Sequence, residues 1–252
     1  KIRRVILVGM GTSYNAAMVG RHYIENIARL PAEVDNASEF RYRNPLIDEG
    51  TLVISIGQSG ETVDTLAAME QARDGGASQV TICNVVGSQA SRLSDSTIYT
   101  KCGLEIGVCS TKTFTSSILS LYLLSCYLGQ VRNVIMEDQV RHLLEPLAKL
   151  PSLLGEITSN MDMCNRISES LSGSDHFLFL GRGLQFPIAM EGALKLKEVS
   201  YIHAEGYPAG EMKHGPIALI DNKMPVVAIV AQDELRDKMM NNIEQVKARG
   251  GV

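Results

Sequence analysis

The segment Gln58-Ser59-Gly60-Glu61-Thr62 places hydroxyl-bearing side chains between an apolar run and a helical pattern. The apolar run, Leu52 to Gly57, predicts a buried strand, and Val63 to Gln71 predicts a helix. A turn of this kind directs free backbone N–H groups and the positive end of the helix dipole at one point, which suits a phosphate group. Ser and Thr before a helix are also common N-caps, so capping alone is an alternative explanation for this segment.

Two further turns have the same character. Gly9-Met10-Gly11-Thr12-Ser13 follows a predicted strand, Arg4 to Val8, and Cys109-Ser110-Thr111-Lys112-Thr113 precedes another helical pattern. We therefore expect three hydroxyl-bearing turns to converge on one edge of a sheet, where they could bind a phosphorylated ligand.

Glu191, Lys195 and Glu198 could move protons. They are spaced by four and then three residues, so they share one face of the helix predicted for Ala189 to Tyr201. Such a trio is often a solvent-exposed series of ion pairs, which is the structural alternative. The neighbouring positions are mostly apolar, and a carboxylate held beside a lysine in a pocket can transfer protons to and from a substrate.

His214 lies between Lys213 and Gly215-Pro216, in a segment that cannot form a regular helix. A histidine at such a position is often merely exposed, but one that is held in place can carry a proton near neutral pH. His203 and His214 lack the spacing and the neighbouring ligands that a zinc site requires, so we expect no metal.

Strands and helices alternate through the first half of the chain. Val80 to Val85 and Thr97 to Thr100 predict two more strands, and Thr113 to Leu128 predicts a helix with a largely apolar surface. This order predicts an α/β fold with a parallel sheet covered by helices on both faces. Met136 to Leu154 and Ile157 to Leu171 then predict two amphipathic helices with no strand between them.

The second half restates the first, which favours an internal duplication. The matching pairs are Ile6 to Gly11 with Leu178 to Gly183, Ala37 to Phe40 with Ala204 to Tyr207, and Leu52 to Ile56 with Val226 to Val230. The turn Gln58 to Thr62 corresponds to Gln232-Asp233-Glu234-Leu235, where acidic residues would repel a phosphate. We therefore predict a first subdomain over 1–135, a helical connector over 136–173 and a C-terminally incomplete second subdomain over 174–252, with the anion site in the first.

Composition narrows the class of protein. A chain of 252 residues that is 45% hydrophobic can bury a substantial core, and a net charge of −4 without a basic run argues against nucleic acid and anionic membranes as partners. The longest apolar stretch, Ile118 to Leu128, is too short to span a bilayer and predicts a buried core helix. Five scattered cysteines and the absence of a signal-peptide pattern fit the cytoplasm.

Several familiar motifs are absent. Both candidates for the dinucleotide pattern G-x-G-x-x-G have an aromatic residue, Tyr14 or Phe186, at the last position, and no P-loop sequence occurs. Gly57 to Gly60 resembles a nucleophile elbow, but Glu61 stands where that motif needs glycine. We therefore expect no nucleotide cofactor and no serine hydrolase.

Taken together, six segments resemble the isomerase (SIS) domain of the glucosamine-6-phosphate synthase family in its bacterial form, over essentially the whole chain. These segments are Gly11 to Tyr14, Gln58 to Thr62, Glu105 to Val108, Ser110 to Lys112, Glu191 to Glu198 and Gly210 to Pro216. The resemblance implies two tandem SIS subdomains, each a flavodoxin-like, three-layer αβα unit, and a fructose 6-phosphate ligand. The family positions that bind this ligand match Thr12, Ser13, Gln58, Ser59, Thr62, Val108 and Ser110, with the phosphate on Gln58, Ser59 and Thr62.

The resemblance also implies catalytic roles. Glu198 matches the carboxylate that moves a proton between C1 and C2 of the sugar, Lys195 a lysine that assists it, and His214 the histidine that opens the sugar ring. In the family this histidine comes from the partner subunit, which implies a homodimer. The implied reaction converts fructose 6-phosphate and glutamine to glucosamine 6-phosphate and glutamate, without a cofactor.

The chain departs from the family pattern in three respects. Gly57 stands where a serine that also contacts the phosphate is common, and Cys109 replaces a usual alanine. The glutaminase domain and the C-terminal tail, with its Schiff-base lysine, lie outside these 252 residues, so we expect a chain truncated at both ends. A non-catalytic, SIS-type sugar-phosphate regulator and a simple phosphosugar isomerase are the alternatives, although the joint presence of Glu198 and His214 favours an enzyme.

Overall fold

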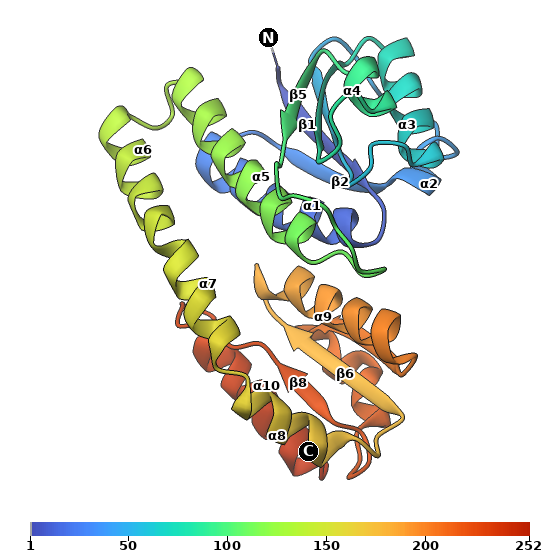
Figure 1. Ribbon diagram of the computed structural model, residues 1–252, viewed down its shortest axis with the longest axis vertical. Helices are drawn as coiled ribbons and strands as arrows, with labels where there is room; N and C mark the ends of the chain where they lie inside the picture. Colours follow the sequence, from blue (N-terminus) through green and yellow to red (C-terminus); the bar gives the residue numbers. More distant parts are fainter. Residues whose placement is uncertain (1) are drawn as a thin grey trace. The chain divides into compact units, whose positions relative to one another are not determined.

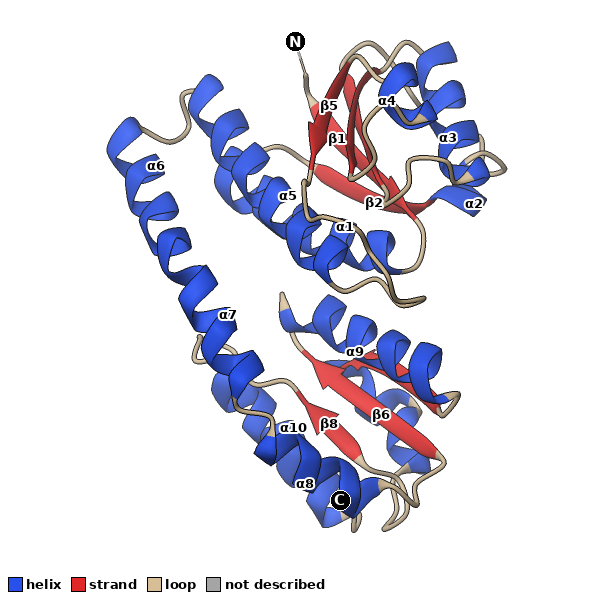
Figure 2. Cartoon of the chain, viewed as in Figure 1, coloured by secondary structure: helices blue, strands red, loops and turns tan. Residues whose placement is uncertain are grey.

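The computed structural model describes residues 2–252 and divides into two compact units, Lys1–Ile135 and Met136–Val252, which are described separately below. Each unit contains a parallel β-sheet with helices on both faces (Figures 1 and 2). The predicted fold class is therefore confirmed. The finer division into a connector over 136–173 and a second subdomain stays a prediction.

Unit 1 is built on a five-stranded sheet of order β2-β1-β3-β4-β5. Figure 1 shows α1 and α5 on one face of this sheet and α2, α3 and α4 on the other. The strands are β1 (Arg4–Gly9), β2 (Ala32–Asn36), β3 (Thr51–Ile56), β4 (Ser78–Cys83) and β5 (Ser96–Tyr99). The helices are α1 (Thr12–Tyr23), its π-helical continuation η1 (Ile24–Ala28), α2 (Ala37–Phe40), α3 (Val63–Asp74), α4 (Gln89–Leu93) and α5 (Lys112–Val131).

The continuous apolar runs of the strands are explained by burial on both faces of the sheet. Along β1, Val5 and Leu7 belong to the core on the side of α1 and α5, whereas Ile6 and Val8 belong to the core on the side of α2 and α3. Alternate residues of one strand therefore hold two layers of helices in place, and the central strands β1 and β3 are almost entirely buried, whereas the edge strands β2 and β5 are partly exposed.

Helix α5 differs from its prediction as a buried core helix. Leu121 is fully buried within the core that includes α1, but Leu119, Leu123, Tyr127 and Val131 are exposed on another side of the helix. Among residues 2–252, α5 is the one helix whose length of 20 residues and hydropathy would allow a membrane crossing. The prediction holds for the side of the helix on which Ile118, Leu121, Leu124 and Leu128 pack in the core, whereas Leu119, Leu123 and Tyr127 line an open cavity beside β3, β4 and β5.

Unit 2 has a three-stranded sheet of order β7-β6-β8. Its strands are β6 (His176–Gly181), β7 (His203–Pro208) and β8 (Val226–Ala228). Its α-helices are α6 (Glu137–Leu144), α7 (Leu150–Ser159), α8 (Asp162–Leu171), α9 (Gln185–Ser200) and α10 (Arg236–Ala248), and its 3₁₀ segments are η2 (Glu145–Lys149), η3 (Ala209–His214) and η4 (Pro216–Leu219).

The helices before β6 correct a second prediction. Met136 to Leu154 is not one helix, because Pro146 lacks an N–H group and lies in the 3₁₀ segment η2 that separates α6 from α7. The following break lies at Asn160 rather than at Gly155, which α7 accommodates within its length.

The strand registers revise the internal repeat. Gly9 pairs with Asn36, and its counterpart Gly181 pairs with Pro208. The residues that correspond to Ala37–Phe40 are therefore Ala209 to Met212, five positions later than predicted. By the same reasoning, β3 corresponds to 225–229 rather than to 226–230. The internal duplication itself is supported, because the strand order β2-β1-β3 recurs as β7-β6-β8. The short sequence matches gave the wrong corresponding residues within it.

Candidate active site

The sheet of unit 1 has a natural ligand crevice where its strand order reverses, between β1 and β3. The turn after β1 leads to Thr12 and Ser13, the first two residues of α1, and the turn after β3 is loop 57–62. Both turns leave the carboxyl ends of neighbouring parallel strands. The structure therefore places Thr12 and Ser13 on the same edge of the sheet as Gln58, Ser59 and Thr62.

The shape of loop 57–62 is fixed by the start of α4. Gly60 has a φ of 68°, and a Cβ atom at this position would lie 2.3 Å from the Ser88 hydroxyl oxygen. The carbonyl oxygen of Gly60 accepts a hydrogen bond from the Ala90 amide at 3.0 Å, and the Ser59 hydroxyl accepts one from the Glu61 amide at 3.2 Å. Only glycine fits at position 60, and the loop is a defined turn.

Capping does not explain the hydroxyl of Thr62. This residue occupies the N-cap position of α3, but its side chain makes no capping hydrogen bond. The amide groups of the first helical turn are therefore not satisfied by a side chain, and they stay available to an anion. The capping alternative for Thr62 is excluded.

Glu61 places a negatively charged side chain next to the predicted phosphate site. In the structure its Oε1 accepts a hydrogen bond from the Gln89 amide at 2.8 Å, at the start of α4. The carboxylate is thus directed at a different helix N-terminus, and it fastens the loop there. Sequence reasoning missed this role because the two residues are far apart in the chain.

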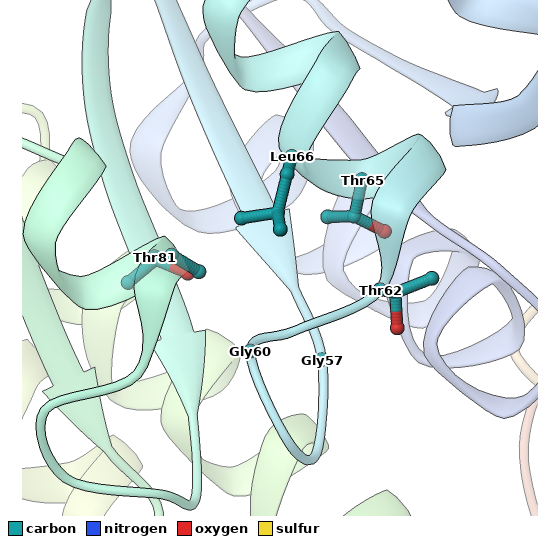
Figure 3. A pocket seen from close by; sticks show the side chains of 7 residues that line it. Gly57, Gly60, Thr62, Thr65, Leu66 and Thr81 are labelled. Carbon is teal, nitrogen blue, oxygen red and sulfur yellow. The ribbon is translucent and has the colours of Figure 1, made fainter.

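A small cavity lies beneath loop 57–62 (Figure 3). Its volume is about 10 Å³, which is close to the space of one water molecule and far too small for a phosphate group. Its lining comprises Gly57, Gly60, Thr62, Thr65, Leu66, Thr81 and Ala90. A phosphate group therefore does not fit in this cavity, and the outer side of the loop, where Thr62 is exposed, is the surface that is open to a ligand.

The third predicted turn lies in loop 100–111, which connects the carboxyl end of β5 to α5. Val108 is almost fully exposed at its tip. The hydroxyl oxygen of Ser110 is buried and lacks a hydrogen-bond partner among the described residues, an unusual state that a ligand or water molecule would relieve. All three turns therefore lie at one edge of the sheet, whereas their convergence on one ligand and the identity of that ligand stay predictions.

In unit 2, Glu191, Lys195 and Glu198 form a connected ion-pair cluster on α9. Lys195 Nζ lies 3.3 Å from Glu191 Oε1 and 2.5 Å from Glu198 Oε2. Glu191 is only 5% exposed, so this cluster is not the solvent-exposed series of ion pairs that the spacing also allowed. A buried carboxylate is costly unless a cation accompanies it, and here it fixes the position of Lys195.

The pKa of Lys195 shows which group can accept a proton. Partial burial would lower this pKa, but the hydrogen bond and charge of Glu198 and the charge of Glu191 outweigh it, so the pKa is raised above 10.5. Lys195 is therefore a cation at neutral pH and cannot act as a base. The two carboxylates are the groups of this cluster that can accept a proton, and the side chain of Glu198 is the more exposed of the two.

His214 is exposed at the end of η3, where Gly215 turns the chain with a φ of 146°. Segment η3 packs through Ala209 and Met212 into the core that includes α10, whereas α9 packs against the other face of the sheet. The structure therefore does not bring His214 and Glu198 together within unit 2. Among residues 2–252, no group of three or more His, Cys, Asp or Glu side chains could hold a metal ion.

Comparisons with known proteins agree with this architecture. The family model described as "SIS domain" matches residues 1–126 and 170–252, which is most of the chain. The chain belongs to the SIS domain family. This SIS chain is 51% identical over 252 residues to the glutamine–fructose-6-phosphate aminotransferase (isomerizing) of Pseudomonas putida, and it spans 41% of that relative's length.

Solved structures also resemble this SIS chain. The C-terminal domain of glucosamine-fructose-6-phosphate aminotransferase from Francisella tularensis superposes with a TM-score of 0.97 at 45% identity, over 99% of this chain and 71% of that one. Glucosamine-6-phosphate deaminase from Thermotoga maritima, at 23% identity, has a TM-score of 0.80 over 99% of this chain and 74% of its own. The second likeness shows the fold alone.

Proposed function

We propose that this SIS chain is the isomerase core of an enzyme that makes glucosamine 6-phosphate from fructose 6-phosphate and glutamine. The observation that carries the proposal is the Glu198–Lys195–Glu191 cluster, with a contact of 2.5 Å between the Glu198 carboxylate and a lysine that stays protonated. The names of its close relatives support the same reaction.

Loop 57–62 binds the phosphate of the sugar in this proposal. The uncapped first turn of α3 supplies backbone N–H groups, and Gln58, Ser59 and Thr62 supply side-chain donors. Thr12, Ser13, Val108 and Ser110 line the rest of the sugar from the two other turns. The orientation of Glu61 toward α4 supports this assignment because it removes the nearest carboxylate from the loop.

We assign the proton transfer to Glu198. After ammonia has condensed with the C2 carbonyl of the open-chain ketose, with loss of water, the carboxylate takes a proton from C1 of the resulting imine and returns it to C2, while the O1 proton moves to the nitrogen, so that an amino aldose forms. Without ammonia, the same removal of a C1 proton from the ketose itself gives an enediolate and exchanges that proton with solvent. Lys195, as a fixed cation beside Glu198, stabilises negative charge that develops during the transfer. Glu191 keeps this cation in place.

Ring opening requires a second copy of the chain. Elements that pack on opposite faces of one sheet carry Glu198 and His214, which supports a site that a second copy of the chain completes. We infer that His214 of one subunit serves the site of its partner in a homodimer, where it moves the protons that open the ring. The whole protein would add a glutaminase domain as the source of ammonia and would act in the cytoplasm.

The experiment that tests this function follows deuterium entering fructose 6-phosphate in D2O by NMR, with the wild-type chain and with Glu198→Gln. The variant should bind the sugar phosphate as the wild type does but should lose exchange. Equal exchange in both proteins would exclude Glu198 as the base.

A further inference from the structure

Loop 100–111 is unusually well anchored for a segment without regular structure. The side-chain amide of Asn84, which follows β4, makes three hydrogen bonds to its first part: it donates to the Gly103 carbonyl at 2.7 Å and accepts from the Thr100 hydroxyl at 3.0 Å and the Cys102 amide at 3.1 Å. These contacts fix where the loop leaves the sheet, but they do not reach its tip.

Glu105 anchors the second part of loop 100–111 to the start of α5. Its Oε2 accepts hydrogen bonds from the amide and the hydroxyl of Thr113, at 3.0 Å and 2.7 Å, and its Oε1 accepts one from the Thr111 hydroxyl at 3.2 Å. Lys112 adds a hydrogen bond from its Nζ to the Leu104 carbonyl at 2.5 Å. Residues 106–110 are thereby closed into a short loop tied at both ends to the start of α5.

The carboxylate of Glu105 also replaces a missing helix cap. Thr111 occupies the N-cap position of α5, but its side chain makes no capping hydrogen bond. Glu105 instead accepts from the amide of Thr113 in the first turn, where the helix dipole favours a negative charge. Partial burial would raise the pKa of Glu105, but the hydrogen bonds from Thr113 and Thr111 outweigh it and lower the pKa, so the group is ionised at neutral pH.

The tip of loop 100–111, residues 106–110, makes little apolar contact with the rest of unit 1. Ile106 and Val108 are 87% and 98% exposed, so apolar packing within the described residues does not define their positions. The loop that carries the sugar-lining Val108 and Ser110 therefore depends on hydrogen bonds at its ends. Pre-ordering such a loop lowers the entropy that a ligand must overcome on binding.

We propose that Glu105 is a positioning residue, whose carboxylate holds residues 106–110 in place for the sugar part of a bound sugar phosphate. This inference rests on the proposed function. It assigns to Glu105 a role that acts through Val108 and Ser110, without contact between Glu105 and the ligand.

The test compares the affinities of the wild-type chain and Glu105→Gln for fructose 6-phosphate and for inorganic phosphate, measured by NMR titration. The glutamine keeps the side-chain shape but offers one acceptor oxygen where two are used. Affinity for fructose 6-phosphate should fall by roughly tenfold, the effect of losing about one such hydrogen bond. Affinity for inorganic phosphate, which needs only loop 57–62, should stay within about twofold.

Asp48→Asn provides a matched control. The Asp48 carboxylate accepts hydrogen bonds from the Gly50 amide at 3.0 Å and the Thr51 hydroxyl at 2.9 Å, the same kinds of donor that Glu105 uses, and it also forms an exposed ion pair with Arg3. It precedes β3 and so lies at the opposite edge of the sheet. This variant should lose a similar amount of stability to urea and keep both affinities.

A second variant, Thr113→Val, removes the hydroxyl that Glu105 accepts from. If Glu105 acts through this contact, the loss of affinity in the double variant should be smaller than the two single losses combined. Equal binding of fructose 6-phosphate by the wild type and Glu105→Gln would refute the positioning role and leave the proposed function intact, and an equal loss for both ligands would refute it as well. Failure of the wild-type chain to bind either ligand would instead refute the proposed function.

Discussion

Gly57 offers a gain-of-function test of the phosphate loop. A Cβ atom at this position would lie 3.8 Å from its nearest neighbour, the Gly60 amide nitrogen, and Gly57 does not have a positive φ. A serine therefore fits without strain, and its hydroxyl would point from the same turn that carries Ser59 and Thr62. A hydrogen bond to a charged group contributes about 1.5–3 kcal/mol, from which ordering the side chain subtracts about 0.5 kcal/mol.

Gly57→Ser should therefore strengthen the binding of fructose 6-phosphate by about 1–2.5 kcal/mol, or about 5- to 70-fold. Gly57→Ala is the matched control, because it adds the Cβ atom without the hydroxyl. Both variants should raise the free energy of unfolding by about 0.4–1 kcal/mol, since they restrict the unfolded chain equally. Calorimetric titration would measure the affinities, and a serine variant that binds no more tightly than the alanine variant would refute the placement of the phosphate on this loop.

Three other predictions follow from the same structure. Gly60→Ala should lower the free energy of unfolding, measured in urea titrations, by about 2–4 kcal/mol, because the alanine would have a positive φ and its Cβ atom would clash with Ser88. A change below about 1 kcal/mol would contradict the loop geometry. The pKa of Glu105 is lowered in the folded protein, so its stabilising effect is present above pH 4.5 and is lost as the pH falls through the folded pKa. The difference in unfolding free energy between the wild type and Glu105→Gln should therefore shrink from about pH 6 to about pH 3. A difference that stays constant over this range would contradict the carboxylate cap. Mixing Glu198→Gln with His214→Ala should restore part of the deuterium exchange that each lacks alone, and no recovery in verified mixed dimers would contradict the exchange of histidines between subunits.

The layers of the fold could be predicted from periodicity alone. The apolar runs in β1 and β3 and the hydroxyl-bearing turns after them marked both the parallel sheet and the edge where Thr12, Ser59 and Thr62 lie. This succeeded because burial on both faces of a sheet and the chemistry of a strand-to-helix turn are local properties of the chain.

The anchors of the site could not be predicted in this way. Glu61, Asn84 and Glu105 act through partners that the fold, and not their spacing, brings close. Glu105 did lie in a segment that resembled the family, but its sequence carried no sign that its carboxylate would cap α5. The predicted repeat was misplaced for a similar reason, since the register of β6 with β7 depends on pairing across the sheet.

The separation of His214 from Glu198 could also not be predicted from their spacing in the sequence. Only 15 residues lie between them, and a sequence offers no sign that a strand places them on elements at opposite faces of a sheet. This placement is the reason why the proposed chemistry includes a second subunit.

Deuterium exchange into fructose 6-phosphate, followed by NMR in D2O with the wild-type chain and Glu198→Gln side by side, tests the central claim most directly. If Glu198 is the base, the wild-type chain exchanges deuterium into the sugar and the variant does not, although both proteins broaden the signals of the bound sugar. Binding without exchange in the wild type, or equal exchange in both proteins, would contradict it and would describe a sugar-phosphate-binding module or a different base.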